Sequence, residues 1–549
     1  MNLRRPLPIV VVLASASPLC VAEPVAQHTE VLGPFTGHDA KLHPGNVSPV
    51  QIRYYGTDLG WSYAHQGRLQ FLFGDTAATE SGEPIEAATG RAYDDAFGSI
   101  DLEEWTDPAR ITRGNVPPIL IGQHAGSPEA AALDPGHPME SFKTPVGGFS
   151  NGRNEYGVFY FSKPRGCRVD ADCGDGLACD TGLGYFGSPV DDDAGLTLAC
   201  ADGTPACNAD TMRTAGGEPI AGSGFCVDTT SSAWADTPVG RISGVAVHNL
   251  IGIRSTEDPR RYTNVRRWLT NKFSNPAFRT VERFDPTEGV DRAHRDYSDA
   301  KGAGGGQRVF IWGRPGFVGV GARQRSLGMY FAYVDMPVGA DFEWNVRYFV
   351  GTDANGRPQF SPDEHRAVAV DLDATRAGVQ TEETWDIVDQ VSIAWVEPLG
   401  KWVMLYGGGM VTLPTKELPR CGVLELFARD ECTDVVVGKG AIHMRTADQP
   451  WGPWTAPQDV LEGGDPAISP PELQYAPGGV LRHPDCKGDA CVGHTDFEGI
   501  NPREYGFLYA ANIISEWTRP APGGGADILW NVSTWDPYRV VLVRTRIRP

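Results

Sequence analysis

Short runs of apolar and aromatic residues recur along the chain, and each is bounded by Gly, Pro or Asn. Such runs are typical of β-strands joined by turns, whereas the apolar spacing of long helices is scarce. The runs lie at 69–76, 156–163, 242–250, 308–314, 327–335, 391–409, 505–513 and 528–547. The pattern therefore predicts an all-β protein.

Residues 391–457 predict a four-stranded antiparallel unit. "WVEPLGKWVMLY" indicates a hairpin that turns near Leu399–Gly400, and "IHMRTADQPWGPWTAPQDV" indicates a strand, a Pro/Gly turn and a second strand. Units of this kind around an axis form a β-propeller, which limits exposed sheet edges. The runs predict a propeller of about five blades. Because the repeats have no strict period, a β-sandwich is the alternative.

Residues 167–226 do not fit a blade. This stretch is rich in Cys, Asp and Gly and cannot bury much apolar surface, so cross-links must stabilise it. We expect a disulfide-rich loop insertion at about 165–228 within one domain, 23–549. The disulfide candidates are Cys167, Cys173, Cys179, Cys200, Cys207, Cys226, Cys421, Cys432, Cys486 and Cys491. Zinc is disfavoured, since no His alternates with Cys pairs at finger spacing.

Residues 1–22 are interpreted as a signal peptide. Arg4 and Arg5 precede an apolar stretch and "CVA", which predicts cleavage after Ala22. A lipid anchor on Cys20 is less favoured because a Leu precedes it. No later apolar run reaches the about 18 residues that a spanning helix needs. We expect a soluble protein that is secreted, periplasmic or on the cell surface.

The acidic charge disfavours two classes of partner. Cleavage removes two arginines and no acid, so the formal charge moves from −21 to −23. Such a chain repels nucleic acid and anionic lipid. A monomer without a cofactor is expected. "DADCGDG" (170–176) leaves calcium as an alternative, but its acids miss the EF-hand spacing and favour a solvated loop.

The segment "YYGTDLGWSYAHQGRLQFLFGDT" (54–76) predicts a hairpin with candidate chemistry. A two-residue turn at Gln66–Gly67 would place Asp58 opposite Asp75, with Cβ atoms about 4.5–5.5 Å apart. A bulge would shift this register by one residue. Facing acids split their pKa values, which suits the proton donor and the carboxylate of glycoside hydrolysis. The alternative is that Asp58 caps a turn and Asp75 ends a strand in solvent.

"GTDLGWSYAHQGRLQFLFGDT" resembles the opening hairpin of glycoside hydrolase family 183, first described as domain of unknown function 4185. The resemblance continues in "YDDAFGSID", "TPVGGF", "RTADQPWGPWTAPQDV" and "STWDPYRVVLVRTRI". It implies a five-bladed propeller that acts as an endo-D-arabinanase on mycobacterial-type arabinogalactan or lipoarabinomannan. It also implies that Asp58 and Asp75 are catalytic. The Cys-rich insertion departs from the family pattern and leaves the exact glycan open.

Further candidates accompany the hairpin. Asp94, Asp95, His483 and Trp61 are candidate substrate-binding residues, with Tyr63 as a second aromatic on the first strand. Each candidate also has a structural interpretation. The aspartates could be turn residues in solvent, His483 could be structural beside a Pro turn, and the aromatics could belong to a blade core. Glu397, Glu472 and Glu498 are reserve proton donors.

Two functions follow from these patterns. The first is a secreted glycoside hydrolase that cleaves furanosidic linkages in a polysaccharide. The second is a non-catalytic carbohydrate-binding or adhesive propeller. A phosphate loop and an H-E-x-x-H zinc motif are both lacking. The patterns do not decide between retention and inversion, or which Asp is the acid.

Overall fold

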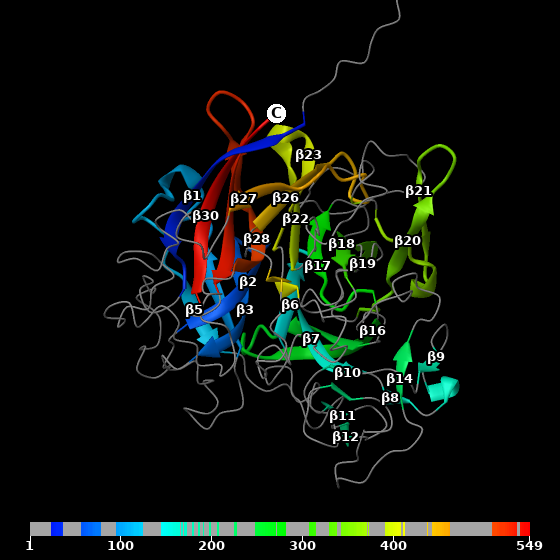
Figure 1. Cartoon of the computed structure of the whole chain (residues 1–549). Helices are drawn as coiled ribbons and strands as arrows, with labels where there is room; N and C mark the ends of the chain where they lie inside the picture. The colour runs from blue at the N-terminus through cyan, green and yellow to red at the C-terminus, as the bar shows by residue number, and fades with distance from the viewer. Residues whose placement is uncertain are drawn as a thin grey trace, which may run out of the picture.

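The computed structural model describes the strands and turns of the chain. The described residues are 23–36, 56–77, 95–123, 144–164, 247–270, 272–281, 307–314, 329–336, 342–370, 372, 390–407, 410–411, 436–437, 442–461, 508–534 and 539–549, with short pieces of 166–227. They form five antiparallel sheets around a common centre, as Figure 1 shows. The predicted five-bladed β-propeller is confirmed, and the β-sandwich alternative is wrong.

Each blade runs from an inner to an outer strand. Blade 1 contains β2 (Gly56–His65), β3 (Arg68–Ala77), β4 (Ala96–Asp101) and β5 (Leu120–Gln123); blade 2 contains β6 (Thr144–Ser150), β7 (Glu155–Pro164), β15 (Val247–Arg254) and β16 (Tyr262–Thr270). Blade 3 contains β17 (Ala277–Val281), β18 (Gln307–Gly313), β19 (Tyr330–Met336), β20 (Arg347–Thr352) and β21 (Pro358–Ser361). Blade 4 contains β22 (Val391–Val396), β23 (Lys401–Gly407), β26 (Ile442–Ala447) and β27 (Gln458–Leu461). Blade 5 contains β28 (Leu508–Pro520), β29 (Ala526–Thr534), β30 (Arg539–Arg548) and β1 (Val25–Pro34).

The inner strands β2, β6, β17, β22 and β28 contact one another in a closed ring. A hydrogen bond crosses every junction of this ring. The donor–acceptor pairs are Trp61 Nε1 to Pro145 O, Thr280 Oγ1 to Ser150 O, Arg279 Nε to Ile393 O, Ile513 N to Ser392 Oγ and Asn512 Nδ2 to Ser62 Oγ. These bonds fix the five sheets relative to one another at their inner edges, where a propeller binds its ligands.

The last blade closes the ring with the first strand of the chain. β1 pairs antiparallel with β30, and Val31 lies opposite Val543. The backbone N–H groups of Phe35 and Thr36 then donate to Val540 O. Both ends of the described chain therefore belong to one blade.

Apolar cores fill the spaces between neighbouring blades. Blades 3 and 4 share a cluster in which Trp312 and Trp402 are fully buried, with ring centroids 5.6 Å apart. Blades 4 and 5 share Val403 with Ile528, and blades 5 and 1 share Trp517 with Phe71. Alternating residues on each strand supply these contacts, as the aromatic and β-branched runs predict.

The blade 4 prediction is confirmed in detail. The sheet order is β22-β23-β26-β27, and Gly400 makes the turn in the left-handed conformation after the 3-10 helix η8 (Glu397–Leu399). Among the described residues, no helix is long and apolar enough to cross a membrane.

The insertion contributes small strand pairs. They are β8 (Gly166–Cys167) and β9 (Ala178–Asp180) with β14 (Gly224–Val227), β10 (Tyr185–Phe186) with β13 (Ala206–Cys207), and β11 (Val190–Asp191) with β12 (Thr197–Leu198). The backbone places Cys179 and Cys226 at paired positions. The thiol groups lie outside the described parts of the chain, so the disulfides stay a prediction. Residues 1–22 also lie outside them.

Candidate functional site

The hairpin of β2 and β3 has the predicted turn but not the predicted register at its far end. Gln66 and Gly67 form the turn with φ of 46° and 77°, and His65 pairs with Arg68. A register shift between Leu59 and Trp61 then pairs Asp58 with Gly74. The expectation that Asp58 lies directly opposite Asp75 is therefore wrong. Asp75 follows Gly74 in β3, and its side chain lies outside the described atoms.

A β-bulge causes this shift. Leu59 and Gly60 have φ of 63° and 86°, a left-handed conformation that places an extra residue in β2. Asn531 Nδ2 of blade 5 donates to Leu59 O at 3.0 Å and so stabilises the bulge. A Cβ on Gly60 would lie 2.8 Å from that same nitrogen, which only glycine avoids.

Asp58 is buried near the beginning of β2, the inner strand of blade 1. Its residue exposure is 5%, and its Oδ2 accepts a hydrogen bond of 2.7 Å from the hydroxyl of Tyr509 on β28. Leu59, Trp61 and Ala510 belong to the apolar cluster around this pair. A carboxylate in such surroundings is stabilised by a donated hydrogen bond.

Gly74 makes room for the Asp58 carboxyl group. A Cβ at this position would lie 2.7 Å from Asp58 Oδ1 and 3.3 Å from the methyl group of Thr144 at the start of β6. Asp95 directly precedes Ala96, the first residue of β4, which pairs with Phe73 of β3. Both acids are buried, Asp95 at 1% exposure.

A second set of buried ionisable residues lies between blades 1 and 2. Arg254, at the end of β15, places Nη1 3.5 Å from Glu155 Oε2 and donates to Gln70 Oε1 at 3.3 Å. Its guanidinium carbon also lies 4.1 Å from the ring centroid of Phe97. Arg254 therefore pairs with a carboxyl group of its own blade and connects blade 2 to blade 1 through a hydrogen bond and a cation–π contact.

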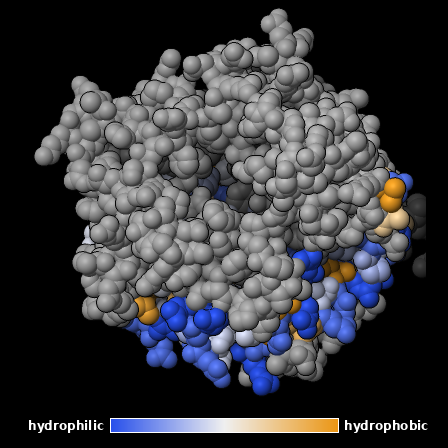
Figure 2. All heavy atoms as spheres, turned by 90° about the horizontal axis from the view of Figure 1, so that it is seen from below, coloured by the Kyte–Doolittle hydropathy of each residue, from blue (hydrophilic) through white to orange (hydrophobic). Residues whose placement is uncertain are grey.

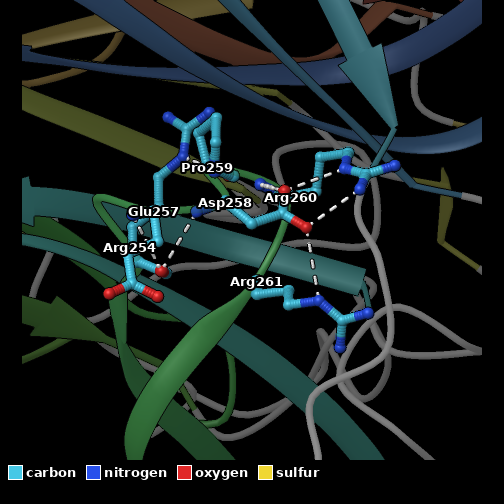
Figure 3. Close-up of polar contacts among 7 residues, drawn as sticks. Arg254, Glu257, Asp258, Pro259, Arg260 and Arg261 are labelled. Carbon is cyan, nitrogen blue, oxygen red and sulfur yellow. Dashed lines mark hydrogen bonds and ion pairs between the residues drawn. The ribbon is translucent and has the colours of Figure 1, made fainter.

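The turn that follows β15 fixes the position of Arg254, as Figure 3 shows. Arg254 Nε donates to Pro259 O at 2.6 Å. Asp258 accepts hydrogen bonds of 2.8 and 2.9 Å from Arg260 and one of 3.3 Å from Arg261. The hydrogen bonds from Arg260 lower the pKa of Asp258 to about 2. The turn is thus a pre-formed support for the buried arginine.

Burial shifts the pKa values around Arg254. Desolvation, with the Glu155 charge second, raises the pKa of Tyr63 well above its ordinary value. Desolvation also raises the pKa of Glu155, although Arg254 opposes this shift. Desolvation and the charge of Arg254 lower the pKa of His65 to about 4, and His65 Nδ1 lies 2.8 Å from Ser150 Oγ. Near neutral pH, His65 is therefore uncharged.

The other predicted residues fall in different places. Trp61 is 5% exposed, and its indole N–H donates to Pro145 O. Most of its ring surface is therefore buried, and stacking of this ring on a sugar stays a prediction. Glu397 follows the last residue of β22 and accepts from Trp395 Nε1 at 2.6 Å, whereas Asp58 lies near the first residue of β2. Asp94, His483, Glu472 and Glu498 lie outside the described residues.

Tyr509 and Arg254 are the residues that sequence reasoning missed. No motif marks either one, and each contacts partners far away in the chain. Seen from below, the described residues along the lower edge of the molecule are mostly hydrophilic, and a few hydrophilic atoms are visible near its centre (Figure 2). Within the described part of the chain, no group of three His, Cys, Asp or Glu residues has the arrangement of a metal site.

Similarity to known proteins is confined to solved structures. No protein-family profile and no curated protein sequence match the chain. An α-L-arabinofuranosidase from Podospora anserina, solved with cellotriose, is similar at TM-score 0.31 and 9% identity over 95% of this chain and 97% of that one. The sialidase of Trypanosoma rangeli is similar at TM-score 0.32 and 11% identity, over 95% of this chain and 60% of the sialidase. These low scores carry no argument about activity, and the fold rests on the sheet topology of the chain itself.

Proposed function

We propose that this protein is a glycoside hydrolase that cleaves furanosidic linkages in a polysaccharide. The proposed activity is endo-acting cleavage of D-arabinan in mycobacterial-type arabinogalactan or lipoarabinomannan, and Asp58 and Asp75 are the proposed catalytic residues. The observation that carries the proposal is the Asp58 carboxyl group, buried at the inner ring and bonded to Tyr509. The resemblance of the 56–76 segment to glycoside hydrolase family 183 supports the substrate class.

The chemistry needs one acid and one carboxylate. The acid gives a proton to the glycosidic oxygen as the bond to the anomeric carbon breaks. In one route the carboxylate attacks that carbon and water then breaks the glycosyl–enzyme bond; in the other the carboxylate takes a proton from the water that attacks the carbon. In both routes water supplies the new hydroxyl group. Because Asp58 pairs with Gly74 and not with Asp75, the two acids are offset along the hairpin. Asp95, which precedes β4, is a proposed contact for sugar hydroxyl groups.

A substrate panel tests the proposal. The purified protein is incubated with arabinogalactan, lipoarabinomannan and plant arabinans, and the products are sized over time. An endo-acting enzyme releases mixed oligosaccharides early and new reducing ends throughout. If glycans are retained on the protein but no reducing ends form from any of them, the enzyme proposal is wrong and the carbohydrate-binding propeller replaces it.

A further inference from the structure

Asp58 and Tyr509 lie on neighbouring inner strands, and each is followed by a residue in the left-handed conformation. Leu59 has φ of 63° and Ala510 has φ of 52°. The register slips after both, between Leu59 and Trp61 in β2 and between Tyr509 and Asn512 in β28. Neither residue is a glycine, so both bulges hold an unfavourable backbone conformation. Bulges beside active sites re-aim side chains, and such strain concentrates at functional sites.

The side chains of Asp58 and Tyr509, the residues that precede the two bulges, form a hydrogen-bonded pair. The hydroxyl of Tyr509 donates to Asp58 Oδ2 at 2.7 Å, and both residues are buried. The apolar neighbours of Asp58 favour its neutral form, whereas a donated hydrogen bond favours the carboxylate. Tyr509 therefore opposes the effect of burial at the position where a reacting carboxylate is needed.

We propose that Tyr509 is a positioning residue that keeps Asp58 ionised and fixes its orientation. This inference rests on the proposed function and deepens it by assigning roles. Asp58 is the carboxylate that attacks the anomeric carbon or accepts the proton of the attacking water. The proton donor to the leaving oxygen is then a different acid. The assignment follows from the donor on Asp58 Oδ2 and from the paired bulges, not from the spacing of the hairpin.

The direct test replaces Tyr509 with Phe, which keeps the ring and removes the hydroxyl. We expect kcat on the D-arabinan substrate to fall about 10- to 100-fold with little change in KM, because a hydrogen bond to a charged group is lost. The midpoint of the acidic limb of the pH–rate profile moves to higher pH. Tyr348→Phe is the matched control: it removes a buried hydroxyl in blade 3 that accepts a hydrogen bond of 3.3 Å from Trp268 Nε1, and both readouts stay at wild-type values.

A second measurement does not depend on turnover. Carboxyl carbons are labelled with ¹³C-aspartate, and the Asp58 signal is assigned by its loss in Asp58→Asn. We expect this signal to titrate at higher pH in Tyr509→Phe than in wild type. Incorporation of 3-fluorotyrosine at position 509 keeps the packing and strengthens the donor, so the signal then titrates at lower pH.

The outcomes separate the inference from the proposed function. An unchanged Asp58 titration in Tyr509→Phe overturns the inference, as does a lower kcat without movement of the acidic limb. Full activity of Asp58→Asn instead overturns the proposed function. A fully active Tyr509→Phe beside an inactive Asp58→Asn keeps the proposed function and rejects only the role of Tyr509.

Discussion

Gly74 lies directly opposite Asp58 in the β2–β3 ladder, and a Cβ at position 74 would come within 2.7 Å of Asp58 Oδ1. The absence of a side chain at Gly74 is therefore a requirement for the observed position of the carboxyl group. The same Cβ would also approach a terminal methyl group of Leu59 at 2.8 Å, in the bulge that sets the register. Local backbone geometry and the candidate chemistry are coupled at this pair.

Gly74→Ala tests this coupling. The added methyl group displaces the Asp58 carboxyl group, and we expect kcat/KM on arabinan to fall about 100-fold, the effect of an error of about 1 Å in a catalytic group. Steady-state kinetics and a thermal melt provide the measurement. Gly313→Ala in blade 3 is the control, because a Cβ there would meet Phe273 Cδ1 at 2.3 Å and so lower the melting temperature without displacing Asp58. Equal activity of Gly74→Ala and wild type would show that the carboxyl position does not matter.

Arg254 makes the contact between blades 1 and 2 sensitive to substitution. Arg254→Met leaves Glu155 buried without its cation, and we expect the free energy of unfolding to fall by about 3–5 kcal/mol. Urea denaturation measures this change. Adding Glu155→Gln should recover part of the loss, since the uncompensated charge is removed. Arg260→Met, with a side chain 57% exposed, should cost far less. Equal losses for Arg254 and Arg260 would contradict this account.

His65 predicts a pH dependence of stability. Its pKa in the folded protein is lowered from 6.5 to about 4 by burial and by the charge of Arg254. Between these pH values the unfolded chain binds a proton that the folded chain does not, so stability falls as the pH drops from about 6.5 to about 4. His65→Gln should lose less stability than wild type across this window.

Thermal melts of variant and wild type are recorded at several pH values. The difference between their melting temperatures isolates the contribution of His65 to stability. His28→Gln provides the control, because His28 is exposed on β1. Parallel pH dependence in His65→Gln and wild type would show that this imidazole does not bind a proton differently in the two states.

Local patterns could predict the strands and tight turns but not the long-range pairings. Gln66–Gly67 and Gly400 are local turn signals, and the structure confirms both. The bulge at Leu59 depends on Asn531, a residue 472 positions away, so no local pattern reveals it. Tyr509 lies 451 positions from Asp58 for the same reason. The predicted register of the first hairpin is wrong because tertiary contacts there outweigh the local preference for regular strand pairing.

The most direct test of the central claim is the activity of Asp58→Asn. The change removes the carboxylate, retains its size, and is compared with Asp448→Asn, whose side chain is 73% exposed beside Lys401. Reducing ends released from D-arabinan are measured for both variants, with circular dichroism to verify folding. We predict loss of activity by a factor of at least about 1,000 for Asp58→Asn and none for Asp448→Asn, because no other group can replace the carboxylate. Release of reducing ends by folded Asp58→Asn at the wild-type rate would contradict the account.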